Sequence, residues 1–119
     1  MGNNKSYDSE AAKSRYRKIR DENIQNILNY YNVDKLSCNR CNATSEYFGY
    51  FDFHHIDPKE KEASISSMMG HKNWKKMKKE LDKCEVLCPS CHRLHHLKEQ
   101  ENERKEINER KIFEVNIFE

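Results

Sequence analysis

Two Cys-x-x-Cys pairs are the parts of this chain whose residue types and spacing most clearly indicate chemistry. The first pair is Cys38 and Cys41, and the second is Cys88 and Cys91. Zn²⁺ takes four tetrahedral ligands, and each short pair supplies two sulfurs at about 2.3 Å. Two disulfides or four unrelated buried thiols are the alternatives. Because both pairs have the spacing of metal-binding knuckles and residues 1–10 are polar, the sequence favours a structural zinc site.

Histidines are grouped around these cysteines. His54 and His55 form a doublet between the two pairs, and His92 and His96 follow the second pair. Imidazole titrates near neutral pH and binds divalent metals, so it suits both ligation and proton transfer. Neighbouring residues of a strand point to opposite faces, so one histidine of the doublet can face a metal while the other meets a water. The pattern therefore predicts a catalytic metal site in addition to the zinc.

Three residues near these motifs have less specific interpretations. Cys84 lies in an apolar run, which is typical of a small buried hydrophobic residue rather than of an extra ligand or a reactive thiol. Asp52 and Asp57 flank the doublet. Each could place a carboxylate oxygen behind a metal ligand, but we favour a cap or turn role for both.

Composition and charge favour a small metal-stabilised domain that contacts nucleic acid. Of its 119 residues, 35% are apolar and 35% are charged, so the core is modest and metal binding would supply much of the stability. The net charge is only +2, but basic residues occur in clusters. These clusters either solvate helix faces or contact a phosphate backbone. The predicted phosphate contacts are Arg15, Arg17, Lys72, Lys75, Lys76 and Lys79.

Apolar periodicity predicts the elements that position these side chains. We expect an amphipathic helix over 10–31 with Ser9 as its N-cap, and an aromatic-rich strand over 47–53 that delivers the histidine doublet at its end. A polar loop over 59–72 follows. The next helix carries an apolar stripe, which is more typical of core packing than of base stacking. That stripe consists of Trp74, Met77 and Leu81.

A second short strand over 85–87 and a helix beginning at His92 complete the predicted α+β domain. This helix is highly charged beyond Leu97, which is typical of a solvated helix. The apolar tail that ends the chain predicts docking on this chain, on a second copy or on a partner protein. The tail consists of Ile112, Phe113, Val115, Ile117 and Phe118.

Two observations concern membranes and compartment. Met1-Gly2 with Ser6 matches an N-myristoylation pattern, but the pattern is short and occurs often by chance, so we discount it. No segment is apolar for long enough to cross a membrane. We expect the cysteines not to form disulfides, and this predicts a reducing, intracellular compartment rather than secretion.

Taken together, the motifs resemble the HNH endonucleases, which combine a zinc-stapled ββα-metal (His-Me finger) core with zinc knuckles and are common in phages and mobile elements. The resemblance covers residues 38–96. It is specific because the doublet, both knuckles and a terminal Cys-His-x-x-x-His occur together and in order. The segments that carry it are Phe53-His-His-Ile-Asp-Pro58, Trp74 and Glu80-Leu-Asp-Lys-Cys-Glu-Val-Leu-Cys-Pro-Ser-Cys-His-Arg-Leu-His-His96.

The resemblance implies a role for each matching histidine. His54 would bind the catalytic metal, His55 would be the general base, and His92 would be the opposing metal ligand. His96 would complete the metal site or grip the phosphate. His95 has no role in the family's pattern and is taken as a surface residue.

The family also implies a catalytic divalent ion, and we expect Mg²⁺ or Mn²⁺ there, although imidazole ligands alone favour softer ions. One position departs from the family. Lys83 stands where the central asparagine is usual, and an ammonium can donate a hydrogen bond but cannot accept one as an amide does. We expect Lys83 to face the substrate phosphate, since an ammonium turned toward the imidazole ligands would repel the metal.

The sequence therefore predicts a metal-dependent endonuclease acting on DNA. Its expected parts are a basic tail and helix over 1–36, the nuclease core over 37–97, and a charged helix with an apolar tail over 98–119. A zinc-stapled nucleic-acid-binding module without cleavage, and a structural or protein-interaction zinc domain, are the alternatives. The doublet together with His92 favours chemistry over binding, and the basic clusters favour nucleic acid over a protein partner.

Overall fold

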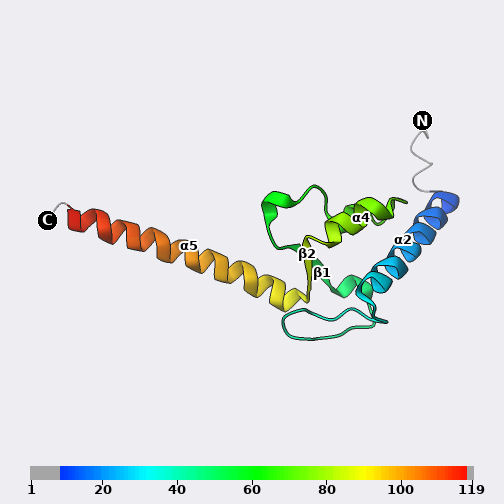
Figure 1. Ribbon diagram of the computed structural model, residues 1–119, viewed down its shortest axis with the longest axis horizontal. Coiled ribbons are helices and arrows are strands. Elements are labelled where there is room, and N and C mark those ends of the chain that lie inside the picture. Colours follow the sequence, from blue (N-terminus) through cyan, green and yellow to red (C-terminus); the bar gives the residue numbers. More distant parts are fainter. Residues whose placement is uncertain (1–8, 118–119) are drawn as a thin grey trace.

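The protein is a small α+β domain from which one long helix projects (Figure 1). The structure, a computed structural model, describes the backbone of residues 9–117 and the side chains of residues 9–111. Within this range it contains four α-helices and a two-stranded antiparallel sheet. The molecule measures 72 × 43 × 24 Å, and its long dimension follows helix α5 (Pro89–Ile117). The predicted α+β class is confirmed.

Helix α2 (Glu10–Tyr31) has the predicted bounds and the predicted N-cap. The Ser9 side chain accepts a hydrogen bond from the backbone amide of Ala12 at 3.1 Å, which satisfies one of the free amides of the first turn. The buried face is narrow and consists of Ile27 and Asn23. The side-chain amide of Asn23 donates to two backbone carbonyls of the segment before the next long helix, so α2 is fixed against that segment.

Strands β1 (Asp52–His55) and β2 (Cys84–Leu87) form the sheet, with His54 opposite Glu85. The prediction of a strand over 47–53 is wrong in its bounds, because Phe48–Tyr50 forms a 3-10 turn and β1 itself contains the histidine doublet. Packing explains the difference. The rings of Phe48 and Phe53 pack with centroids 5.8 Å apart, so aromatic side chains that suit a strand are used here to fill the core around a turn.

The polar loop expected over 59–72 contains a short helix, α3 (Ile65–Met68), whose N-cap is Ser64. Ile65, Met68 and Met69 are all buried in the core cluster that also contains Ile27. The prediction missed them because three apolar residues in a polar segment produce no clear period. They matter for the site because they anchor the segment that joins β1 to the following helix.

Helix α4 (Trp74–Leu81) confirms the core interpretation of its apolar stripe. Met77 and Leu81 are 0% and 1% exposed, and Trp74 packs edge-on against the ring of Tyr30 with centroids 6.4 Å apart. The stripe is therefore covered by protein and does not form a stacking platform for bases. Cys84, at the start of β2, packs against the same cluster, in agreement with its predicted role as a small hydrophobic residue.

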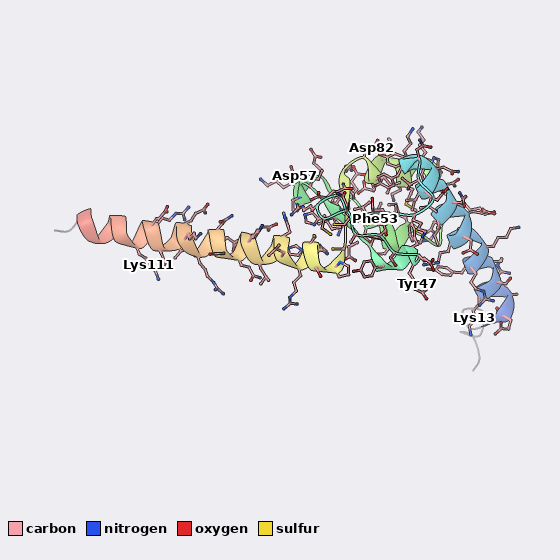
Figure 2. The ribbon with its side chains drawn as sticks, turned by 90° about the horizontal axis from the view of Figure 1, so that it is seen from below. Lys13, Tyr47, Phe53, Asp57, Asp82 and Lys111 are labelled. Carbon is pink, nitrogen blue, oxygen red and sulfur yellow. The ribbon has the colours of Figure 1, made fainter. Side chains whose placement is uncertain are left out.

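Helix α5 begins at Pro89, three residues before the predicted start, and continues unbroken past residue 97. Proline suits the first turn because its missing amide hydrogen would have no partner there. Beyond residue 97 the side chains through Lys111 are exposed, and Lys111 lies far from the core in Figure 2. None of the helices in the described part of the chain combines the length and apolar character needed to span a membrane.

Two sequence expectations fall outside the described residues. They concern the Met1-Gly2 and Ser6 pattern at the start and the side chains of the apolar tail from Ile112 to Phe118. The docking of the apolar tail therefore remains a prediction from the sequence.

Candidate metal centres

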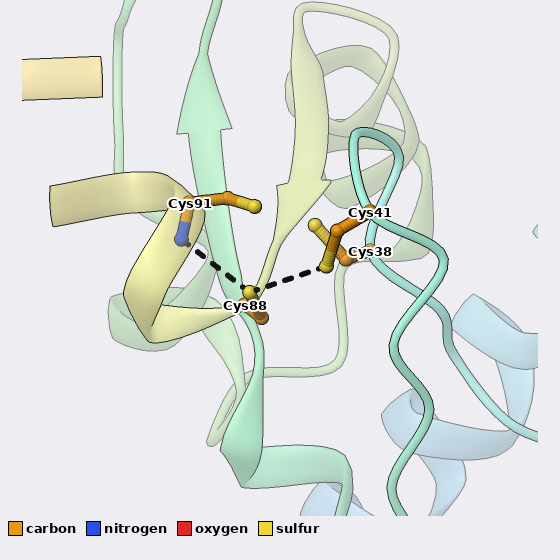
Figure 3. A group of neighbouring side chains, drawn as sticks. All are labelled: Cys38, Cys41, Cys88 and Cys91. Carbon is orange, nitrogen blue, oxygen red and sulfur yellow. Dashed lines mark hydrogen bonds between the residues drawn. The ribbon is translucent and has the colours of Figure 1, made fainter. Parts of the chain in front are cut away.

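The sulfurs of Cys38, Cys41, Cys88 and Cys91 meet between the first cysteine turn and the start of α5 (Figure 3). All four Sγ atoms lie within 4.8 Å of one another, and those of Cys41 and Cys88 are 3.7 Å apart. Four sulfurs bound tetrahedrally at about 2.3 Å would be about 3.8 Å apart. All five cysteines of the chain are free thiols rather than disulfides. The group could therefore hold a metal ion, and four thiolates are a donor set that suits zinc.

Backbone hydrogen bonds shape each cysteine turn. The amide of Cys38 donates to the carbonyl of Ala43, and the amide of Asn42 donates to the carbonyl of Cys38, both at 2.9 Å. Asn42 has a φ of 63°, a left-handed conformation that asparagine tolerates better than most residues. In the second turn, the amide of Cys91 donates to Sγ of Cys88 at 3.4 Å as α5 begins. These bonds orient the sulfurs of each turn toward one another.

The acidity of the thiols is uneven. Burial acts to raise the pKa of Cys38, but hydrogen bonds from the backbone of Cys88, Cys41 and Arg40 outweigh it and lower the pKa to about 6. Hydrogen bonds with the other three cysteines raise the pKa of Cys91 to about 12. Ionising one thiol thus opposes ionisation of its neighbours. A divalent cation among the sulfurs would remove this conflict by stabilising all four thiolates.

Three histidines form a second potential ligand group. Ligand nitrogens of His54 on β1 and of His92 and His96 on α5 all lie within 4.8 Å of one another. The Nε2 atoms of His92 and His96 are 3.0 Å apart, and two nitrogens bound at about 2.1 Å and at right angles would be about 3.0 Å apart. Behind this group, Oδ2 of Asp52 lies 3.0 Å from Nδ1 of His92 and so orients the ring. The predicted set is thus brought together.

Burial lowers the pKa of His54, and the neighbouring His95 and His92 lower it further. The lowered pKa favours the neutral ring, which is the form that binds metals. This environment agrees with the role of ligand that the family resemblance implies.

His55 points to the opposite face of β1 and is 6% exposed. Its Nε2 lies 3.0 Å from Oε1 of Glu80, which is 1% exposed and also accepts the amides of Glu62 and Ala63 at 3.2 Å. Burial acts to raise the pKa of Glu80, but hydrogen bonds from Lys83 and His55 outweigh it and lower the pKa to about 2. The ionised carboxylate therefore stabilises the fold above about pH 4.5, and this contribution is lost as the pH falls toward 2.

Lys83 is turned toward Glu80. Its Nζ donates to Oε2 of Glu80 at 2.7 Å and to the backbone carbonyl of Glu60 at 2.9 Å. The ammonium thus joins the end of α4 to the loop that follows the histidine doublet. We expected Lys83 to face a phosphate, and such a contact would require it to leave these partners. In its observed position Lys83 instead holds the loop beside His55.

Sequence reasoning missed two members of these sites and misjudged a third. From the sequence, Glu80 had no role beyond its place in a motif. Its position on the apolar side of an amphipathic helix could have indicated that its carboxylate is buried and paired. His95, assigned to the surface, has its ring centroid 4.4 Å from that of His54. Asp52 contacts His92, so the cap or turn role we favoured is wrong for it, whereas Asp57 does cap a 3-10 turn by accepting the amide of Lys59 at 3.0 Å.

The six basic residues predicted to contact a phosphate backbone are all exposed. Arg15 and Arg17 lie on α2, Lys75 and Lys76 lie with Lys79 on α4, and Lys72 precedes α4. Helices α2 and α4 pack against each other, so the two basic clusters belong to adjoining elements. Contact with DNA remains a prediction.

No protein-family model, no curated protein and no solved structure matches this chain.

Proposed function

We propose that the protein is a metal-dependent HNH endonuclease that hydrolyses phosphodiester bonds of DNA. The observation that carries the proposal is the convergence of His54, His92 and His96 on one point, with Asp52 behind His92. Along the chain, β1, β2 and α5 bring a strand, a strand and a helix together around the histidines, which is the arrangement that we expect of a ββα-metal unit. Zinc in the cysteine group would then fix β2 and the first turn of α5, which together place the histidine ligands.

The histidine group supplies the electrostatic part of this chemistry. A divalent cation held there would polarise the scissile phosphate and stabilise the leaving oxygen, and Mg²⁺ or Mn²⁺ is our proposed ion. His54 and His92 would fix its position from two different elements. Asp52 accepts the proton on Nδ1 of His92, so that Nε2 is the nitrogen available for ligation.

His55 and Glu80 supply the proton transfer. The carboxylate of Glu80 accepts the proton on Nε2 of His55, which leaves Nδ1 as the nitrogen able to take a proton from water. Lys83 and the amides of Glu62 and Ala63 hold the carboxylate in turn. In this interpretation Lys83 keeps the loop in place, as the family's central asparagine would, by a different set of hydrogen bonds.

Plasmid cleavage in the presence of different divalent metals tests this function. Wild-type protein should nick or linearise supercoiled DNA with Mg²⁺ or Mn²⁺, and His54→Ala or His92→Ala should lower the rate at least about 100-fold, since removing the group behind a ligand already costs 10–100-fold. His71→Ala is the matched control, because His71 is exposed and lies outside both ligand groups. Binding of DNA without cleavage under any metal would instead support the zinc-stapled binding module.

A second prediction concerns the basic residues. Lys75→Ala and Lys79→Ala should each weaken DNA binding for all sequences and reduce the slope of log K against log salt by about one unit per lost phosphate contact. Lys111→Ala, at the far end of α5, is the control and should leave the slope unchanged. Lys83→Met should also leave it unchanged, since the ammonium is engaged by Glu80. If Lys83→Met lowers the salt slope, Lys83 contacts a DNA phosphate, as we expected from the sequence.

A further inference from the structure

A second group of potential ligands shares His54. Besides the group with His92 and His96, ligand atoms of His54, His95 and Glu99 all lie within 4.8 Å of one another. The ring centroid of His95 is 4.4 Å from that of His54, closer than those of His92 at 5.2 Å and His96 at 5.7 Å. The Nε2 atom of His95 also pairs with a carboxylate oxygen of Glu99.

Helix geometry explains why α5 offers two pairs. His92 and His96 are four residues apart, and so are His95 and Glu99. Within each pair, the two side chains therefore lie about one helical turn apart on the same side of the helix. The two pairs occupy adjacent stripes of the same face. His54, reaching across from β1, lies within ligand distance of both.

We propose that His54, His95 and Glu99 form a second metal position, which is an alternative to the position formed by His54, His92 and His96. This inference builds on the proposed catalytic metal site. Both groups use the side chain of His54, which donates one nitrogen to one ion at a time. The protein would therefore hold a single exchangeable ion that occupies either position, in addition to the ion held by the cysteines.

The two positions differ in chemical preference. Three imidazoles favour softer ions such as Ni²⁺, whereas two imidazoles and a carboxylate favour harder ions such as Mn²⁺. Mn²⁺ should therefore favour the position with Glu99 and occupy the proposed catalytic position, with His92 and His96, in a minority of molecules. Ni²⁺ should favour the position with His92 and His96. The identity of the ion would thus determine which of the two positions it occupies more often.

Metal titration of the zinc-loaded full chain tests this selection. Free Mn²⁺ is followed by its electron paramagnetic resonance signal, and Ni²⁺ binding is followed by calorimetry. His95→Ala and Glu99→Gln should weaken Mn²⁺ binding at least about tenfold and change Ni²⁺ binding less than about twofold, because loss of a direct ligand costs at least as much as loss of the group behind one. His92→Ala and His96→Ala should give the opposite pattern. Glu103→Gln, another exposed acid on α5, is the matched control.

Each alternative result overturns a defined part of the proposal. Unchanged Mn²⁺ affinity in both His95→Ala and Glu99→Gln, with loss of Ni²⁺ binding in His92→Ala, removes the second position and leaves the proposed catalytic site intact. If all four variants lose affinity for Mn²⁺ and Ni²⁺ equally, the ligands form one combined site. That result would also overturn the proposal of two alternative positions. Binding of neither ion by the wild-type protein overturns both positions, and with them the metal site of the proposed nuclease.

Discussion

Replacing Cys91 with serine should remove the zinc and unfold the domain. The four sulfurs join the first cysteine turn, the end of β2 and the start of α5. Besides a small core cluster, one backbone hydrogen bond from Asn39 to Val86 and the Arg40–Glu85 ion pair also connect the turn to β2. Zinc binding to such a site contributes about 10–16 kcal/mol, which is comparable to or larger than the whole stability of a typical domain at about 5–15 kcal/mol. Loss of one thiolate would therefore leave too little free energy to keep the chain folded.

The measurements are the zinc content per chain after dialysis and the circular dichroism of the variant. Cys84→Ser is the matched control, because Cys84 lies outside the cysteine group and packs against the other core cluster. It should keep its zinc and lose only about 1 kcal/mol of stability, in the range of ordinary substitutions. Folded, reduced wild-type protein that contains no zinc would rule out the structural role of this site.

The ligand pairs from which the metal groups are built were predictable from the sequence because their information is local. A Cys-x-x-Cys turn places two sulfurs together through its own backbone, and the four-residue spacing of His92 and His96 places them on one face of a helix. The cap by Ser9 is local in the same sense. These features need only short-range geometry, and the structure reproduces each of them.

What the sequence did not reveal depends on contacts between distant segments. Glu80 acquires its role only when α4 packs beside β1, 25 residues away from His55 along the chain. His95 acquires its place because β1 brings His54 to α5. Helix α3 exists because its apolar residues are covered by neighbouring helices, and its four residues are too few for a periodic pattern.

Replacing His55 with alanine should lower the rate of cleavage by about 100- to 10,000-fold while zinc content and DNA affinity remain near wild type. The substitution removes the proposed proton acceptor and no metal ligand, and general base catalysis typically contributes an effect of this size. Cleavage is measured in single-turnover experiments at saturating protein. Because His55 is 6% exposed, thermal unfolding must show that the variant is folded at the assay temperature.

Glu80→Gln distinguishes catalysis by the His55–Glu80 pair from a structural role of His55 alone. Glu80 accepts from His55 with Oε1 and from Lys83 with Oε2, but glutamine has only one acceptor oxygen. The variant therefore loses one of these two hydrogen bonds, and the maximal rate should fall while DNA affinity is unchanged. The variant should also lose about 3 kcal/mol of stability at neutral pH, since a buried charge partner is removed. This difference should shrink as the pH falls from about 4.5 toward 2, because the wild-type carboxylate progressively takes up a proton.

Glu62→Gln provides the matched control for Glu80→Gln. Its carboxylate pairs with the same lysine, Lys83, at 3.6 Å, but the side chain is 77% exposed, so its removal should change stability by less than about 1 kcal/mol and leave the rate unchanged. If Glu80→Gln, folded at the assay temperature, cleaves DNA as fast as wild type, then the orientation of His55 by Glu80 plays no part in the reaction. If His55→Ala also cleaves at the wild-type rate, the proton acceptor must be sought among the imidazoles on the other face of β1.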